Sequence, residues 1–235
     1  MHAQGVDLVK LMITGGVMDA KERGVPGELK MPPEMVRAVC ERAHALGYTV
    51  AAHTESPEGV RVALENGVDS IEHGAKPDDE ILRLFHERGA FLCVTLSPAL
   101  PYALFDRSVT HLTEVEQFNG NVVMEGMVAC AKAALAHDIP IALGNDVGCQ
   151  WVAQYDFWRE LCYFHKYAGA SNACALYCAT GQSARLAGHE RGHDRRGRKP
   201  ARRSACVAHA RHGRRARPGH RPAEGETQRP ARRRA

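Results

Sequence analysis

Four residues of the sequence combine a reactive side chain with a place in or just after an apolar segment. Lys10 lies within the apolar residues 8–13, His53 ends residues 49–53, and His73 ends residues 68–73. Asp146 follows the apolar residues 139–144, inside the string Gly-Asn-Asp-Val-Gly. If these segments are adjacent parallel strands, their carboxyl ends bring the four side chains to one site.

The side-chain types suit a metal centre that activates water. Neutral imidazoles bind zinc, cobalt, nickel or iron. A carboxylate such as that of Asp146 can bind a metal and accept a proton from water, as the general base in metal-assisted hydrolysis. Burial lowers the pKa of a lysine, and the neutral amine of Lys10 would then add carbon dioxide to form a carbamate, an anionic bidentate metal ligand.

Each residue also has a structural interpretation when it is considered alone. Lys10 would extend to the mouth of the sheet or pair with a carboxylate. A single histidine at a strand end is more often structural, and Gly-Asn-Asp-Val-Gly is a favourable turn sequence. The occurrence of all four at successive strand ends favours the metal site.

The apolar segments alternate with amphipathic ones, which is the pattern of successive β-α units on a parallel sheet. We expect strands at residues 6–13, 48–53, 68–73, 90–95 and 139–144, and helices at residues 33–46, 57–65, 78–88, 122–137, 152–167 and 171–187. We expect the first strand to be buried on both faces. The long connections at residues 15–32 and 97–121 follow strand carboxyl ends, where β/α barrels place lids and substrate loops.

The chain divides into two regions of opposite charge. Residues 189–235 hold 16 basic and 4 acidic side chains, a balance of +12, which leaves 15 basic and 23 acidic ones and a balance of −8 for residues 1–188. The second region has no aromatic residue and almost no aliphatic one beyond alanine, so we expect an α/β domain over residues 1–188 and a disordered Arg/Ala/Gly/Pro-rich tail over residues 189–235. No apolar run reaches the length of about 18 residues that a membrane span requires, and we expect a cytoplasmic protein.

Four strings resemble the amidohydrolase superfamily, in the branch of imidazolonepropionase-like enzymes and Xaa-Pro dipeptidase or arginine carboxypeptidase relatives. They are Val-Lys-Leu-Met-Ile-Thr-Gly-Gly at residues 9–16, Pro-Glu-Gly-Val-Arg-Val-Ala-Leu at 57–64, Gly-Val-Asp-Ser-Ile-Glu-His-Gly at 67–74 and Ala-Thr-Gly-Gln-Ser-Ala-Arg-Leu-Ala-Gly at 179–188. The resemblance implies strands 4 to 8, with their helices, of a TIM (β/α)8-type barrel. The predicted fold class is therefore α/β, a partial barrel.

The same resemblance implies roles for the four residues. Lys10 would be the carboxylated lysine that bridges two divalent metal ions, and His53 and His73 would bind the second ion. Asp146 would complete the site and transfer the proton, and water held between the ions would attack an amide carbonyl. The expected cofactor is a divalent metal, zinc, with two ions in the intact family site.

The sequence departs from the family at both ends and at one position near the site. The family's first strand carries a His-x-His pair that holds the first metal, whereas Met1 lies just before the strand that resembles the fourth. We therefore expect an N-terminally truncated member. The arginine-rich composition after Gly188 is typical of a GC-rich gene read out of frame, so we expect a frameshift near codon 189 in place of the family's β-sandwich. Glu55 stands where many relatives have a histidine or an aromatic residue, which leaves the substrate open.

Three functions remain open from the sequence. The first is a metal-dependent hydrolase of C–N bonds in small amides or dipeptides, active when the missing strands are supplied. The second is a catalytically incompetent amidohydrolase fragment, and the third is nonspecific nucleic-acid binding through the basic tail. The expected partners are the substrate and either a second copy of the chain or a complementing N-terminal half, with neither a membrane nor a specific nucleic acid. Because a partial barrel exposes its outer strands, residues 6–13 and 139–144, we expect association through strand edges.

Overall fold

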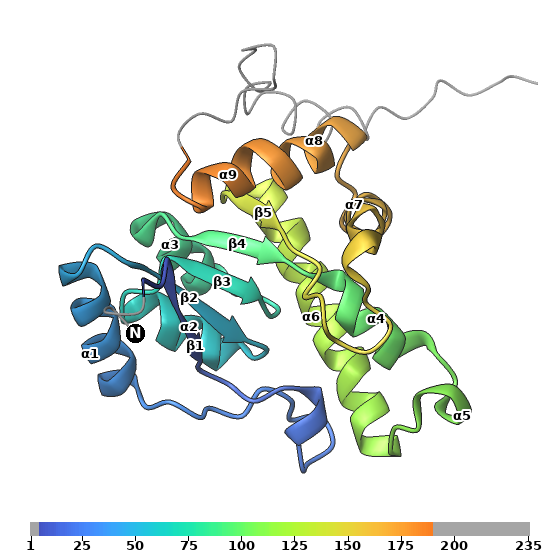
Figure 1. Ribbon diagram of the computed structural model, residues 1–235. Helices are drawn as coiled ribbons and strands as arrows, with labels where there is room; N and C mark the ends of the chain where they lie inside the picture. The colour runs from blue at the N-terminus through green and yellow to red at the C-terminus, as the bar shows by residue number, and fades with distance from the viewer. Residues whose placement is uncertain (1–4, 190–235) are drawn as a thin grey trace, which may run out of the picture.

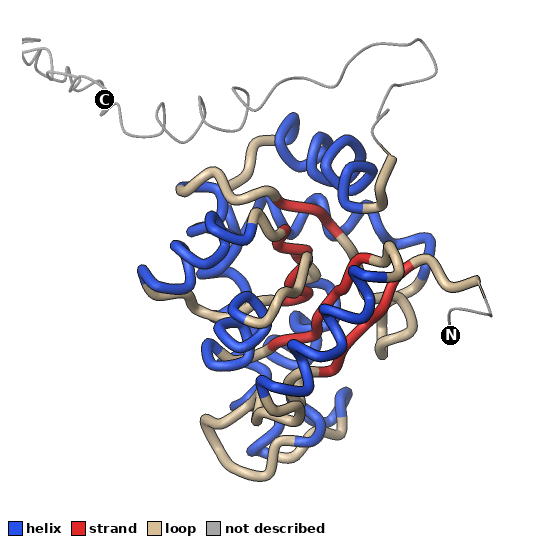
Figure 2. The backbone as a smooth tube through the Cα atoms, turned by 90° about the vertical axis from the view of Figure 1, so that its left-hand side faces the viewer, coloured by secondary structure: helices blue, strands red, loops and turns tan. Residues whose placement is uncertain are grey.

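The computed structural model describes residues 5–189, which form a parallel sheet of five strands with helices around it (Figures 1 and 2). The strands are β1 (Leu8–Met12), β2 (Thr49–Thr54), β3 (Ser70–His73), β4 (Phe91–Val94) and β5 (Ile141–Leu143). They lie side by side in the order of the chain, and every neighbouring pair is parallel. All five predicted strands are present, and their carboxyl ends lie at the same end of the sheet.

The first three helices connect successive strands and begin and end at local sequence signals. They are α1 (Pro33–Ala45), α2 (Pro57–Glu65) and α3 (Asp79–Arg88). Ser56 caps α2 by accepting a hydrogen bond from the backbone of Gly59, and Asp78 caps α3 in the same way from Ile81. Gly89 ends α3 in a left-handed conformation. The predicted bounds of these helices agree with the structure to within one residue.

The connection predicted as a long loop at residues 97–121 is mostly helical, so that prediction was wrong. It contains α4 (Leu96–Leu104), α5 (Arg107–Thr110) and the first turns of α6 (Glu114–Ala136). Thr113 and Glu116 form a capping box that starts α6 eight residues before the predicted start at residue 122. The N-terminus of α4 is capped from far along the chain, because the buried Glu160 carboxylate accepts hydrogen bonds from the backbone of Leu96 and Ser97.

The helices after β5 match the two predicted segments but contain π-helical turns. The first comprises η3 (Gln154–Asp156), α7 (Phe157–Tyr163) and η4 (Phe164–Ala168), and the second comprises α8 (Asn172–Tyr177), η5 (Cys178–Gln182) and α9 (Ser183–Leu186). The second segment packs beside β5, at the end of the sheet away from β1 (Figure 1). The backbone N–H of Leu143 donates to the Ser183 hydroxyl at 3.3 Å. We expected the outer edge of β5 to be unpaired. That expectation is corrected in part, because the Ser183 side chain accepts a hydrogen bond from one backbone N–H of β5.

The first strand is buried on one face only. Leu11 is 6% exposed, whereas Leu8 is 49% and Met12 56% exposed, and Lys10 between them is also exposed. The prediction of a strand buried on both faces was wrong, because among residues 5–189 the elements near the face that carries these alternating side chains leave a hollow over Leu8 and Lys10.

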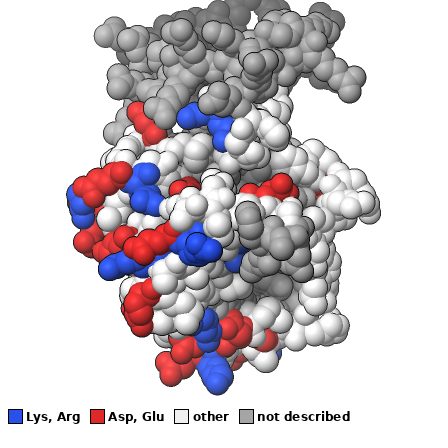
Figure 3. All heavy atoms as spheres, turned by 60° about the vertical axis from the view of Figure 1, so that its left-hand side comes forward, with Lys and Arg blue, Asp and Glu red and all other residues white. Residues whose placement is uncertain are grey.

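Charged side chains of both signs are interspersed on the left and lower parts of the face shown in Figure 3, and its right-hand part is mostly uncharged. Among the described residues, no helix is long and apolar enough to cross a membrane. The predicted tail at residues 189–235 lies outside the described residues except for His189.

Candidate metal centre

The rings of His53 and His73 contact each other at the carboxyl ends of β2 and β3. Their centroids are 4.6 Å apart in an edge-to-face arrangement. In the register of β2 and β3, however, His73 pairs with Thr54 and His53 pairs with Glu72, so simple alternation would put the two rings on opposite faces. His73 has a positive φ of 70°, unusual for a residue with a side chain. This left-handed turn at the end of β3 explains how the ring comes to lie beside His53.

A hydroxyl after the next strand orients His73. The Nδ1 atom of His73 lies 2.6 Å from the Thr95 hydroxyl, and both residues are buried. Because Nδ1 is occupied, Nε2 is the atom left to bind a ligand.

Both imidazoles are held in the neutral form. Burial lowers the pKa of His53. Burial, together with electrostatic interactions with His53 and Lys10, lowers the pKa of His73 well below its usual value. Neutral imidazole is the form that binds metals.

Glu55 is the third member of the cluster. A ligand atom from each of His53, Glu55 and His73 lies within 4.8 Å of the others. Burial raises the pKa of Glu55 to about 7, although a hydrogen bond from the Val17 backbone lowers it. Its Oε2 atom is buried and has no hydrogen-bond partner among the described residues. A buried oxygen without a partner is costly, and a cation would satisfy it.

Gly16 leaves little room for a side chain beside this carboxylate. A Cβ atom on Gly16 would lie 2.9 Å from Glu55 Oε2, closer than real contacts of this kind. The loop between β1 and α1 can therefore pass directly over Glu55.

That loop forms one wall of the cavity in which the cluster lies. The cavity has a volume of about 290 Å³ and is lined by residues of the loop, of the strand ends, of α4 and of α6. Asn119 of α6 fixes the loop by accepting from the backbone of Gly24 at 2.7 Å and donating to the carbonyl of Glu22 at 2.9 Å. The loop crosses from the β1 edge to α6 in Figure 1.

Asp146 lines the same cavity from the turn after β5. It has a positive φ of 50°, its carboxylate accepts a weak hydrogen bond from the Cys149 thiol, and its side chain is exposed. Its negative charge raises the pKa of both His53 and Glu55. The structure thus brings three of the four predicted residues, His53, His73 and Asp146, to one cavity.

Lys10 lies in a neighbouring cavity. It lines a hollow of about 310 Å³ on the inner face of the sheet, together with Thr49, Glu72 and residues of α9. Its charge still contributes to the lowered pKa of both histidines. The burial expected to make its amine neutral is absent, since Lys10 is exposed.

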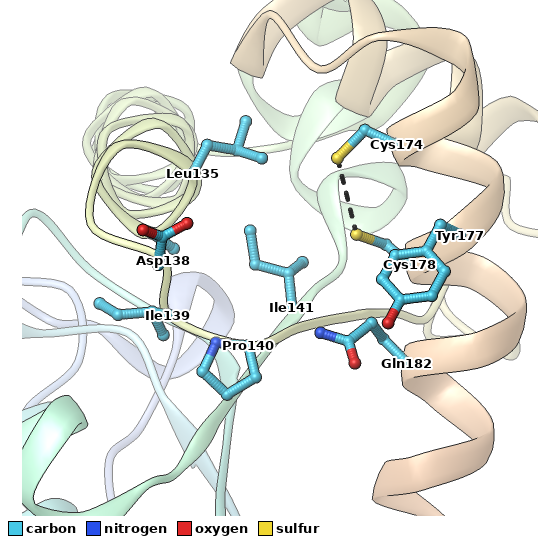
Figure 4. A pocket seen from close by; sticks show the side chains of 10 residues that line it. Leu135, Asp138, Ile139, Pro140, Ile141, Cys174, Tyr177, Cys178 and Gln182 are labelled. Atoms are coloured by element: carbon cyan, nitrogen blue, oxygen red, sulfur yellow. Dashed lines mark hydrogen bonds between the residues drawn. The ribbon is translucent and has the colours of Figure 1, made fainter. Parts of the chain in front are cut away.

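A small cavity, shown in Figure 4, lies at the end of β5 away from the metal centre and has too little room for a substrate. It has a volume of about 40 Å³ and is lined mainly by apolar side chains such as Leu135, Ile139 and Ile141. Cys174 and Cys178 face each other at its side, with their sulfur atoms 4.0 Å apart.

Sequence reasoning missed three residues of the site. Glu55 was noted only as a departure from the resemblance, although its place two residues after His53 was the signal for a third ligand. Thr95 directly follows β4 and could have been found as the next strand end. Tyr102 belongs to α4, a helix that the sequence did not predict, so no local signal placed its ring in the cavity.

Comparisons with known proteins identify relatives of which this chain spans less than half. No family model matches the chain. An uncharacterized protein of Mycobacterium tuberculosis is 29% identical over 120 residues, which are 49% of this chain and 31% of that protein.

Two solved structures give closer agreement. A putative prolidase from Bifidobacterium longum is 40% identical, with a TM-score of 0.75 over 81% of this chain and 48% of that one. A Xaa-Pro dipeptidase with methionine bound in its active site is 28% identical, with a TM-score of 0.67 over 80% of this chain and 45% of that one. The chain thus spans less than half of these enzymes, and the predicted fold class, α/β and part of a TIM-type barrel, is confirmed.

Proposed function

We propose that this chain carries out metal-dependent hydrolysis of C–N bonds in small amides or dipeptides. It matches structures from the Xaa-Pro dipeptidase/prolidase branch of the amidohydrolase superfamily, and the match covers under half of each of those chains. The observation that carries the proposal is the cluster of His53, Glu55 and His73 in one cavity. The similarity to a putative prolidase and a Xaa-Pro dipeptidase supports a hydrolytic role for that cluster.

The residues of the cluster fit a divalent metal. Two neutral imidazoles and a carboxylate are a donor set that zinc prefers, and Glu55 Oε2 is buried without another partner among the described residues. When bound, such an ion polarises a carbonyl oxygen and makes water a better nucleophile at neutral pH. We therefore propose zinc as the metal and His53, His73 and Glu55 as its ligands in this part of the chain.

Asp146 and Tyr102 have the chemistry to act beside the metal ligands. The exposed carboxylate of Asp146 lines the cavity and would accept the proton of the attacking water. Burial raises the pKa of Tyr102, so its hydroxyl stays protonated and would donate a hydrogen bond to the substrate carbonyl.

A second ion requires groups outside the described residues. In the resemblance Lys10 bridges two ions as a carbamate, whereas its side chain is exposed in the described part of the chain. Strands that covered the inner face of β1 would bury Lys10. We therefore propose that full activity needs a complementing N-terminal half or a second chain, and that residues 1–188 act as one domain in this assembly.

The alternative is a chain that keeps the fold but lacks activity. The exposed Lys10, Leu8 and Met12 favour it, because they show one wall of the barrel uncovered in the described residues.

Metal content and turnover separate the two functions. The full chain would be purified, its divalent metal counted by mass spectrometry, and hydrolysis of a dipeptide panel that includes Xaa-Pro peptides measured with zinc added. At least one bound ion per chain together with turnover supports the hydrolase and excludes the inactive fragment. A metal-free, inactive and aggregating protein excludes the hydrolase.

A further inference from the structure

A second cavity opens at the same end of the sheet as the metal centre, where the strands have their carboxyl ends. It has a volume of about 320 Å³ and lies between α4, α7 and the segment after β5. Its walls are rich in aromatic rings, with Phe105 from the end of α4, Trp151 from the segment after β5, and Tyr163 and Tyr167 from the helix after it. The size is within the range of small-molecule sites, which runs from about 300 to 1,000 Å³.

The two cavities lie on either side of α4, and one aromatic contact joins their walls. Tyr102 lines the cavity of the metal centre, and its ring meets that of Trp151 edge to face at 6.5 Å. Trp151 also meets Phe105 edge to face at 5.8 Å. Trp151 therefore forms a wall of the second cavity and contacts a wall of the first.

Trp151 is held in an unusual backbone conformation. Trp151 has a positive φ of 63°, which is unfavourable for a bulky residue, and it lies five residues after Asp146, which also has a positive φ. Such conformations persist only where the surrounding structure holds them, and they cluster at functional sites. The same short segment thus carries Asp146 into one cavity and Trp151 into the other.

The charged groups of the second cavity largely neutralise each other. Arg159 and Asp156 are the charged side chains among its lining residues, and they form an ion pair at 3.4 Å. The remaining walls include Leu100, Pro101 and Leu104. Such a cavity favours a neutral ring over a charged group, because burying an unpaired charge is costly.

We propose that this cavity is the specificity pocket for an aromatic side chain of the substrate, with Trp151 as the residue that determines the preference. The inference rests on the proposed function, since the ring would belong to the residue next to the hydrolysed amide. A substrate whose amide lay between His53, His73 and Asp146 would place a neighbouring ring beyond Tyr102, against Trp151.

Fluorescence tests ring binding without requiring turnover. The chain has two tryptophans, Trp151 and Trp158, and the exposed Trp158 is not among the residues that line the cavity. The W158F protein would be titrated with N-acetyl-L-phenylalanine amide and with N-acetyl-L-alanine amide. We expect a saturable change in the emission of Trp151 with the phenylalanine compound and at least about tenfold weaker binding of the alanine compound, because the phenyl ring is buried.

The matched control is W151F, which leaves Trp158 as the reporter and should show no saturable change. Equal binding of the two compounds, no response of Trp151, or the same response from Trp158 would overturn the proposal, provided that circular dichroism shows both variants folded. Repeating the titration with a chelator and with zinc separates the two proposals. Ring binding that persists while zinc fails to bind contradicts only the metal centre, whereas zinc binding without ring binding contradicts only the specificity pocket.

Discussion

At the scale of single residues, the site depends on a left-handed backbone conformation and on buried ionisable side chains, both of which are unfavourable in themselves. His73 reaches His53 through a left-handed turn at the end of β3, and Thr95 holds its Nδ1 atom. Glu55 and Glu160 are two buried carboxyls whose pKa values burial raises to about 7. Glu55 lies in the candidate metal centre, whereas Glu160 caps α4 and touches no residue of the His-Glu-His cluster in the described contacts.

Glu160 makes the stability of the fold depend on pH. Its folded pKa of about 7 lies above its usual value of 4.5, so the folded state holds the proton more tightly than the unfolded state. The stability that it contributes is complete below pH 4.5 and is lost as the pH rises through 7, by at most about 3 kcal/mol. Relative to the native chain, E160Q should therefore gain stability by up to this amount between pH 5 and pH 8.

Urea unfolding of the two proteins across that range measures the difference. Taking the difference cancels the contributions of Glu55, His53 and His73, which both proteins share. E58Q, at an exposed position in α2, is the matched control and should follow the native chain. A difference between E160Q and the native chain that stays constant with pH would refute this account of Glu160.

At the scale of elements, the cavity depends on the close crossing of α4 and α6. A Cβ atom on Gly120 of α6 would lie 2.8 Å from the Cβ of Tyr102 and 3.1 Å from its carbonyl carbon. The absence of a side chain at Gly120 therefore lets α4 approach and carry Tyr102 to the metal centre.

The substitution G120A should destabilise the fold by about 1–3 kcal/mol, because it overpacks this crossing. G126A, two turns later in the same helix, is the matched control. Its Cβ would come within 3.3 Å of the Lys76 backbone nitrogen, and the better helix propensity of alanine, worth about 1 kcal/mol, should offset that contact. Thermal unfolding that ranks G120A as stable as G126A would contradict the role of Gly120.

Helices and strands could be predicted where the residues that start, end or bury them lie within the same short segment of sequence. The strands follow from apolar segments, and α2 and α3 follow from Ser56 and Asp78 at their starts. By contrast, α4 contains Pro98 and Pro101 and is capped by Glu160, more than 60 residues away, so its sequence alone did not predict a helix. For the same reason the sequence identified His53, His73 and Asp146 by their places after strands but gave no signal for Tyr102. The exposure of Lys10 depends on what covers the sheet, which no local pattern encodes.

At the scale of the whole molecule, β1 presents an uncovered edge and face. It pairs with β2 alone among the described strands, and Leu8 and Met12 are about half exposed. Exposed apolar edges of sheets promote association between chains.

We expect the full chain to associate in solution, and the double substitution L8K/M12K to reduce that association by placing charges on β1. Light scattering against concentration measures both proteins. The matched control is L176K, since Leu176 is equally exposed but lies on α8, away from this strand. A native chain that is monodisperse and monomeric would contradict the expectation.

The central claim is that His53, Glu55 and His73 form a metal centre, and equilibrium dialysis with zinc tests it most directly. The native chain should bind at least one zinc ion, and H73A should bind it at least about 100-fold more weakly, since even residues that only support a ligand account for 10- to 100-fold. H86A removes an exposed histidine of α3 and should bind as the native chain does. A native chain that binds no zinc, or an H73A protein that binds zinc as tightly as H86A, would contradict the account.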